Sequence, residues 1–253
     1  MLLIDVGNTR LKWRQHNIND IGQVKPEVMQ RGSIAVKGLS TEVLLQALPA
    51  DTRTLWFASV ASESVNALLL AWASKHQVAW RQAHSQQQWR DLTSAYADCG
   101  RMGVDRWLAM VAARQLTRQP VCVIDCGSAS TVDFIAANGQ HEGGYIIPGQ
   151  HLMVQSLLKD TAKIAFTEQE SDADDGYGVS TAGAVLKGAQ CFHRLGVMAI
   201  AEQALQSGYR VYASGGDGAF LAHNKAISYV DELVLDGLWA CLYDEPCQIP
   251  EQA

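Results

Sequence analysis

The sequence lacks close cysteine pairs, and its histidines show no metal-ligand spacing. None of the six cysteines forms a CxxC pair of the kind that indicates zinc binding or redox chemistry. We therefore expect reduced, partly buried thiols, with Cys122 and Cys126 on one face of a strand. The seven histidines show no paired spacing, so we predict no histidine-bound metal.

Long apolar runs and basic clusters are also missing. No run approaches the roughly 18 residues that a membrane span needs, and Met1 is followed by Leu2-Leu3-Ile4 without a basic region. The sequence therefore predicts a cytoplasmic protein. A formal charge of -6 without clustered Lys and Arg argues against a nucleic-acid partner. A pocket for an anionic nucleotide needs only local positive groups.

The chain has the length and pattern of a two-domain α/β protein. It has 253 residues, of which 48% are hydrophobic and 18% charged, as is ordinary for a globular protein. Pro120 marks the best candidate boundary, which gives an N-terminal domain of residues 1–119 and a C-terminal domain of residues 120–253. Strands are expected at Leu2–Val6, Thr54–Val60, Val121–Cys126, Thr131–Ala136 and Arg210–Ala213, and helices at Ser62–His76, Val104–Arg118 and Ser180–Ser207, the last with a break near Gly196.

An internal repeat is the most informative feature of the sequence. The segment Leu3-Ile4-Asp5-Val6-Gly7-Asn8-Thr9 is matched by Val123-Ile124-Asp125-Cys126-Gly127-Ser128-Ala129. In each copy a buried strand ends in an aspartate, a glycine permits a tight turn, and small or hydroxylated residues leave backbone N–H groups open to an anion. The repeat predicts a duplicated domain that binds a nucleotide, although two ordinary β-turns would use the same residues.

An ordered series of motifs resembles the type III pantothenate kinase family. The series comprises Asp5-Val6-Gly7-Asn8-Thr9, Gly103-Val104-Asp105-Arg106, Asp125 to Asp133, Gly143 to Gly149, Thr181 with Gly188, and Ser214-Gly215-Gly216-Asp217. The resemblance runs from Met1 to about Ala240. It implies the fold of the acetate and sugar kinase, heat-shock chaperone and actin superfamily, in which two related α/β domains hold ATP between them.

The resemblance also implies a role for individual residues. The expected ATP-binding residues are Asp5, Val6, Gly7, Asn8, Thr9, Arg10, Leu11, Lys12 and Ser128, with Asp5 near magnesium. The expected pantothenate-binding residues are Tyr96, Gly103, Val104, Asp105, Arg106 and Thr181, with Asp105 as the catalytic proton acceptor. Asp125 matches the ligand of a monovalent cation, either potassium or ammonium.

Elementary chemistry fits these roles but leaves structural alternatives open. Phosphoryl transfer needs an aligned hydroxyl, a carboxylate to accept its proton and groups that offset charge. Arg106 could hold the carboxylate of pantothenate through two parallel hydrogen bonds. Asp105 could instead only cap its helix and Arg106 could be a solvated surface residue. Tyr96 could pack on the surface, and Thr181 could cap the following helix.

One departure from the family pattern concerns the cation. The second hairpin usually reads Asp-x-Gly-Thr-Ala, and here Ser128 replaces the threonine. The hydroxyl that would contact ATP is retained, but the missing methyl group alters the packing around Asp125. The replacement therefore bears on the expected site for potassium or ammonium and not on the expected contact with ATP.

The sequence as a whole predicts ATP-dependent phosphorylation of pantothenate, the first step of coenzyme A biosynthesis. The resemblance also implies a homodimer. One alternative is another kinase or a phosphatase of the same superfamily, since only the acceptor pocket would change. A second is a non-catalytic regulatory protein that retains the fold. The joint presence of Asp5, Asp105, Arg106 and Asp125 argues against a loss of activity.

Overall fold

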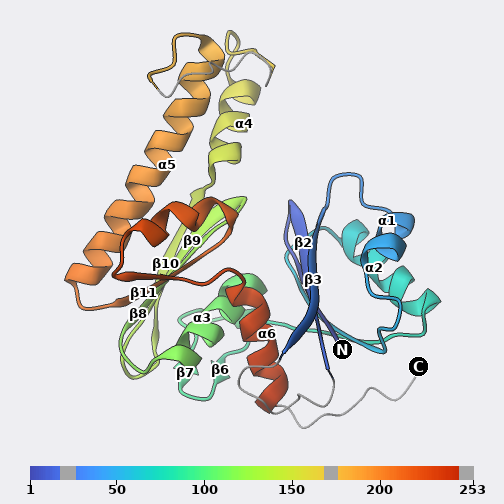
Figure 1. Cartoon of the computed structure of the whole chain (residues 1–253). Coiled ribbons are helices and arrows are strands. Elements are labelled where there is room, and N and C mark those ends of the chain that lie inside the picture. Colours follow the sequence, from blue (N-terminus) through green and yellow to red (C-terminus); the bar gives the residue numbers. More distant parts are fainter. Residues whose placement is uncertain (18–26, 168–175, 245–253) are drawn as a thin grey trace. The chain divides into compact units, whose positions relative to one another are not determined.

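A computed structural model of the chain describes residues 1–17, 27–167 and 176–244 (Figure 1). The described chain divides into two compact units. The first unit contains residues 1–118, 135–142 and 232–244, and the second contains residues 119–134 and 143–231. The first change of unit falls beside Pro120, where the sequence predicts a boundary. The division differs from the predicted domains because 135–142 and 232–244 return to the first unit.

The first unit is built on a five-stranded sheet in the order β3-β2-β1-β4-β5. Its strands are β1 (Leu2–Val6), β2 (Arg10–His16), β3 (Val28–Ala35), β4 (Thr54–Ser59) and β5 (Ala79–Gln82). The strands β1, β4 and β5 pair in parallel, whereas β2 pairs antiparallel with both β1 and β3. Helix α1 (Thr41–Ala47) follows β3, and α2 (Glu63–Lys75) makes the crossover that a parallel pair requires.

Helices cover both faces of this sheet (Figure 1). Alternate residues of β1, Leu2, Ile4 and Val6, share one apolar cluster with Phe57 of β4 and Trp72 of α2. On the other side lie α3 (Val104–Leu116) and α6 (Leu233–Asp244), which pack against each other, and α6 also contacts β1 and β4. The sheet is therefore the middle layer of a three-layer unit.

Polar contacts attach the late segment 232–244 to the first unit. Arg14 of β2 forms ion pairs with Glu232 and Asp236, and the His16 ring lies 4.8 Å from the ring of Trp239. These ion pairs and the ring contact explain why the last helix does not belong with residues 143–231.

The first unit also contains the short strands β6 (Gln88–Trp89) and β7 (Leu92–Thr93) and the 3-10 helix η2 (Cys99–Arg101).

The second unit repeats the strand order of the first. Its sheet has the order β10-β9-β8-β11-β12, formed by β8 (Val121–Cys126), β9 (Ala129–Ile135), β10 (His141–Pro148), β11 (Arg210–Ser214) and β12 (Ile227–Tyr229). The strands β8, β11 and β12 pair in parallel, as β1, β4 and β5 do. The two copies of the sequence repeat therefore occupy the same central strand of two equivalent sheets, which supports the predicted duplication.

The helices of the second unit are α4 (Gln150–Asp160), α5 (Thr181–Gln206) and the 3-10 helix η4 (Gly216–His223). Val197, Ala201 and Ala204 of α5 pack on Cys122 and Cys126 in the core of this unit. Helices α4 and α5 run side by side (Figure 1). The expected break near Gly196 is wrong, because α5 is continuous there.

The structure confirms the α/β class and most of the predicted elements. The strands Leu2–Val6 and Val121–Cys126 are found with the predicted bounds, and the helix predicted at Ser62–His76 spans Glu63–Lys75. The described cysteines are free thiols, and Cys122 and Cys126 share one face of β8 as expected. Cys247 lies outside the described residues. Within the described ranges no helix is long and apolar enough to cross a membrane.

Two helical glycines give opposite stability predictions. A Cβ at Gly237 of α6 would lie 1.9 Å from the carbonyl oxygen of Leu108, so α3 and α6 would have to separate. We expect Gly237→Ala to lower the free energy of unfolding by about 1–3 kcal/mol, the usual cost of overpacking. Urea unfolding followed by circular dichroism measures this change.

Gly196→Ala provides the matched control. A Cβ at Gly196 meets no atom within 4 Å, and the residue is exposed in the interior of α5. The same substitution should therefore raise the stability by about 0.5–1 kcal/mol, because alanine loses less backbone entropy on folding. If both variants changed stability in the same direction, close packing at Gly237 would not be the cause.

Candidate functional site

The first predicted phosphate-binding hairpin connects β1 to β2. Asp5 is the penultimate residue of β1 and lies opposite Lys12 of β2. The turn closes through a 3.0 Å hydrogen bond from the Gly7 N–H to the Arg10 carbonyl oxygen. It exposes three polar side chains, those of Asn8, Thr9 and Arg10. An anion at this turn would meet backbone N–H groups and short polar side chains, as the sequence predicts.

Two of the predicted ATP-binding residues point into the core instead. The side chains of Val6 and Leu11 are fully buried in the apolar cluster of the first unit. A strand places successive side chains on opposite faces, so the predicted run from Asp5 to Lys12 cannot present every side chain to a ligand. Val6 and Leu11 can contribute only backbone atoms to a nucleotide site.

The second hairpin lies between β8 and β9 and follows the same plan. Asp125 is again the penultimate residue of the central strand, and the Gly127 N–H donates to the Ala129 carbonyl oxygen at 3.1 Å. The carbonyl oxygen of Ser128 accepts a hydrogen bond from the Gly149 N–H at 3.1 Å. Gly149 permits this approach, since a Cβ there would lie 2.5 Å from the Ser128 oxygen.

The oxygens around Gly215 suit a hard cation. Gly215 has φ +88°, and a Cβ there would lie 2.4 Å from Oδ1 of Asp125 and 2.3 Å from the carbonyl oxygen of Cys126. Carboxylate and carbonyl oxygens are the ligands that alkali and alkaline-earth cations prefer. The described residues hold no group of three or more His, Cys, Asp and Glu side chains fit for a metal. A cation at Asp125 would therefore need backbone, hydroxyl or water oxygens as its other ligands.

A buried histidine supports the second hairpin. Nε2 of His193, in the middle of α5, lies 2.6 Å from Oγ of Ser130 at the start of β9. Burial lowers the pKa of His193, so the ring is neutral at physiological pH. Burial likewise raises the pKa of the Cys126 thiol to about 12, which rules out a nucleophilic thiolate. The contact of His193 with Ser130 could not be recognised from the sequence, because α5 and β9 are distant in the chain.

The Gly-x-Asp-Arg segment forms the start of α3. Gly103 is the N-cap residue, and Oδ1 of Asp105 accepts a 2.8 Å hydrogen bond from the backbone N–H of Arg106. The alternative in which Asp105 is the cap of this helix is therefore wrong. A Cβ at Gly103 would lie 2.6 Å from Oδ1 of Asp105, so the glycine leaves room for the carboxylate.

The structure brings Tyr96 and Arg106 together. The Nη1 group of Arg106 donates a 2.9 Å hydrogen bond to the Tyr96 hydroxyl, and the guanidinium carbon lies 5.7 Å from the centre of the Tyr96 ring. Arg106 is buried, which excludes the alternative of a solvated surface arginine. A buried guanidinium needs acceptors or a bound anion near its N–H groups. The pair thus joins two of the residues that the sequence assigns to pantothenate binding.

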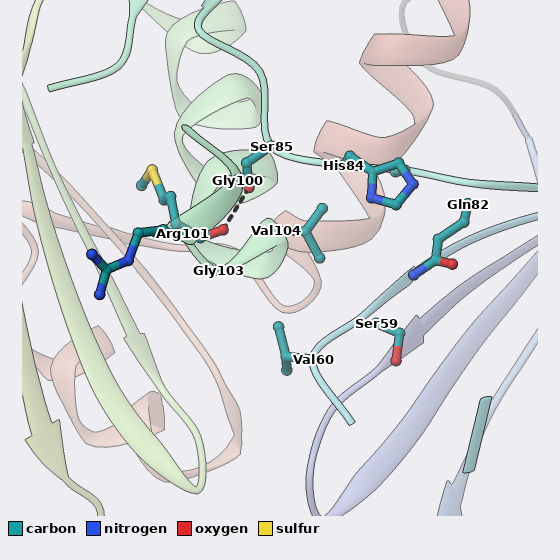
Figure 2. A pocket seen from close by; sticks show the side chains of 11 residues that line it. Ser59, Val60, Gln82, His84, Ser85, Gly100, Arg101, Gly103 and Val104 are labelled. Atoms are coloured by element: carbon teal, nitrogen blue, oxygen red, sulfur yellow. Dashed lines mark hydrogen bonds between the residues drawn. The ribbon is translucent and has the colours of Figure 1, made fainter. Parts of the chain in front are cut away.

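A pocket of about 310 Å³ adjoins this segment (Figure 2). Gly103 and Val104, which the sequence assigns to pantothenate binding, line it, and residues that the sequence did not single out complete it, among them Ser59, Gln82, His84 and Ser85. Oγ of Ser85 donates to the carbonyl oxygen of Met102 at 2.8 Å. In Figure 2 the Arg101 side chain points away from His84 and Gln82. The missed residues sit at or just after the ends of β4 and β5, a position that signals a ligand site in α/β proteins.

Thr181 lies in the second unit, as the exposed first residue of α5. The cap of this helix is Ser180, whose Oγ accepts a 2.9 Å hydrogen bond from the Gly183 N–H. The alternative role of Thr181 as the helix cap is therefore wrong. Its predicted contact with substrate stays a prediction.

Together, the duplicated sheets and their aspartate-glycine turns define the actin-like fold of two related α/β units. A structure described as a "putative 2-dehydro-3-deoxygalactonokinase" from Sinorhizobium meliloti matches with a TM-score of 0.56 and 14% identity over 99% of each chain. A "conserved putative Baf family transcriptional activator" from Campylobacter jejuni matches with a TM-score of 0.54 and 19% identity over 94% of this chain and 95% of that one. At these identities the likeness shows the fold alone.

The sequence comparisons identify the family. The model of the type III pantothenate kinase family matches residues 1–203. A type III pantothenate kinase of Hahella chejuensis is 35% identical over 93% of this chain and 94% of its own length. One of Marinobacter nauticus is 38% identical over 94% and 96%. The chain belongs to the type III pantothenate kinase family.

Proposed function

We propose that this chain transfers a phosphoryl group from ATP to the hydroxyl of pantothenate, the first step of coenzyme A biosynthesis. The observation that carries the proposal is the hydrogen bond between Arg106 and the Tyr96 hydroxyl, made in the first turn of the helix whose N-cap, Gly103, lines the pocket at the strand ends of the first unit. Membership of the type III pantothenate kinase family supports pantothenate as the substrate. Neither the regulatory alternative nor another acceptor has comparable support. Consumption of ATP with and without pantothenate tests the assignment.

Each hairpin supplies groups for the phosphates of ATP. At the first hairpin these are the Asp5 and Lys12 side chains and the backbone of residues 6–11. At the second hairpin the group is the hydroxyl of Ser128. The threonine that is usual at this position would use the same hydroxyl, so the missing methyl group does not affect this contact. Magnesium bound with ATP would offset phosphate charge, and Asp5 is the carboxylate that we assign to it.

Asp105 acts as the general base in this proposal. As the pantothenate oxygen bonds to the γ-phosphorus, Asp105 accepts the hydroxyl proton and the bond from phosphorus to the bridging oxygen breaks, which releases ADP. The hydrogen bond from the Arg106 N–H fixes the carboxylate. Arg106 itself holds the carboxylate of pantothenate, and Tyr96 orients the guanidinium.

Asp105→Asn tests the base. We expect the variant to fold and bind ATP but to lose about 10²–10⁴-fold in kcat, the usual contribution of general-base assistance. Steady-state kinetics with both substrates measures it. Asp5→Asn is the control, because it should instead weaken the use of magnesium-ATP at every pantothenate concentration. Near-normal turnover in Asp105→Asn would remove Asp105 from the base role.

A monovalent cation is the second part of the proposal. The Asp125 carboxylate and the Cys126 carbonyl oxygen both lie against Gly215, and they suit potassium or ammonium. A bound cation would offset repulsion between this carboxylate and phosphate. We expect potassium, at constant ionic strength, to raise activity in a sodium-only assay, and Asp125→Ala to lose that response with most of the activity. Full activity of the parent protein without potassium or ammonium would contradict the site.

An apolar surface on the second unit supports the proposed homodimer. Leu152 and Leu157 of α4 and Gly188 and Ala189 of α5 line a groove. Phe192, which also lines the groove, is 72% exposed, and Leu195 is 67% exposed about one turn further along α5. Residues at positions i, i+4 and i+7 form one stripe of a helix, the pattern of helix–helix packing. A second copy offers the same stripe, as a two-fold symmetric interface requires.

Phe192→Glu tests this interface. A charge in the stripe should dissociate the dimer, which sedimentation velocity detects as a shift to the monomer mass. Gln190→Glu adds a carboxylate elsewhere on α5, and it should leave the mass unchanged. A parent protein that sediments as a monomer would rule the interface out. The predicted cytoplasmic location and the expected absence of nucleic-acid partners stay predictions.

A further inference from the structure

His141 is a buried polar residue to which the reaction described above assigns no role. It is the first residue of β10 and belongs to the segment 135–142, which returns to the first unit. Its side chain is only 1% exposed. A buried imidazole needs hydrogen-bond partners, so the identity of those partners indicates what the residue does.

The partners of His141 lie in the segment that carries Tyr96. The backbone N–H of Ala95 donates to Nδ1 of His141 at 3.3 Å, which requires an imidazole without a proton on Nδ1. The rings of His141 and Tyr96 stack with their centres 6.4 Å apart and their planes at 5°. The Tyr96 hydroxyl in turn accepts the hydrogen bond from Arg106. Contacts therefore run from His141 through Tyr96 to Arg106.

The turn that carries His141 is firmly attached to the first unit. The Thr93 N–H donates to the Gly139 carbonyl oxygen at 3.0 Å. The buried Arg114 of α3 donates to the Ala137 carbonyl oxygen at 2.6 Å and pairs with Asp91 at 2.7 Å. These bonds place the turn against both the segment before Tyr96 and the helix that carries Arg106.

We propose that His141 is a positioning residue of the acceptor site, which sets the backbone at Ala95 and the plane of the Tyr96 ring. The inference rests on the proposed contact of Tyr96 and Arg106 with pantothenate. Without the imidazole, the Ala95 N–H loses its acceptor and the Tyr96 ring loses the surface that fixes its plane. The hydroxyl then meets Arg106 in a smaller fraction of molecules, and pantothenate binds more weakly.

Two substitutions separate the hydrogen bond from simple filling of space. His141→Phe keeps a ring against Tyr96 but has no acceptor for the Ala95 N–H. His141→Asn loses the ring but places Oδ1 the same number of bonds from Cα as Nδ1, so it can accept that bond. We expect His141→Phe to raise KM for pantothenate about tenfold, as the loss of one neutral hydrogen bond implies, with kcat and KM for ATP within about twofold of the parent.

His141→Asn should recover a large part of that loss. Gln140→Ala is the control within the same turn, because Gln140 bonds the carbonyl oxygens of Thr93 and His141 without touching Tyr96. It should leave all kinetic constants near those of the parent. Thermal unfolding checks the fold of each variant, and His141→Gln replaces His141→Phe if the latter does not fold.

Tyr96→Phe distinguishes failure of the inference from failure of the proposed acceptor site. A raised KM for pantothenate in Tyr96→Phe, with parental values in His141→Phe, would overturn the positioning role and leave the acceptor site standing. A uniform loss of kcat in His141→Phe and His141→Asn would also overturn it, since that result marks a structural residue. Parental kinetics in Tyr96→Phe would overturn the acceptor role of Tyr96 and this inference with it.

Discussion

Parallel pairing of the central strands is the constraint on which the internal arrangement of each unit depends. In the first sheet Val6 of β1 lies opposite Ser59 of β4, and in the second Asp125 of β8 lies opposite Ser214 of β11. The carboxyl ends of parallel strands meet at one edge of a sheet. Polar groups that follow the strands therefore gather within each unit, although the sequence separates them by fifty residues or more.

The start of helix α3 lines a pocket at that edge of the first sheet, where we propose that the acceptor binds. Nearly the whole helix is buried, including Arg106 and Arg114, and Gly237 lets α6 approach it closely. Because α3 is held along its length, its first turn is fixed as well. The Asp105 carboxylate is then positioned by Gly103 and by the N–H of Arg106 rather than by solvent. Such support is what a catalytic group needs to keep its geometry.

The sequence predicted what depends on local pattern. The strand-end aspartates and glycine turns were recognisable because apolar alternation and turn chemistry act over a few residues. It missed β3, whose residues are mostly exposed and carry no apolar alternation. It missed Ser59 and Gln82, which line the pocket, and His141, which contacts the segment of Tyr96, because each reaches its position through a pairing with a distant strand or turn. The mistaken helix cap at Asp105 arose because aspartate is common at helix starts, whereas here Gly103 begins the helix.

The duplication of the sheets did not produce two independent halves. Residues 1–118 contain Asp105, Arg106 and Tyr96, but the buried Arg114 donates to the Ala137 carbonyl oxygen as well as to Asp91, and an unmet buried donor costs about 1–3 kcal/mol. Among the described residues, Arg14 likewise pairs with the carboxylates of Glu232 and Asp236. The first unit therefore reaches its full stability only when segments from the second half of the chain are in place. The proposed acceptor site of the first unit therefore depends on three separate stretches of sequence, residues 1–118, 135–142 and 232–244, although Tyr96, Asp105 and Arg106 all lie in the first stretch.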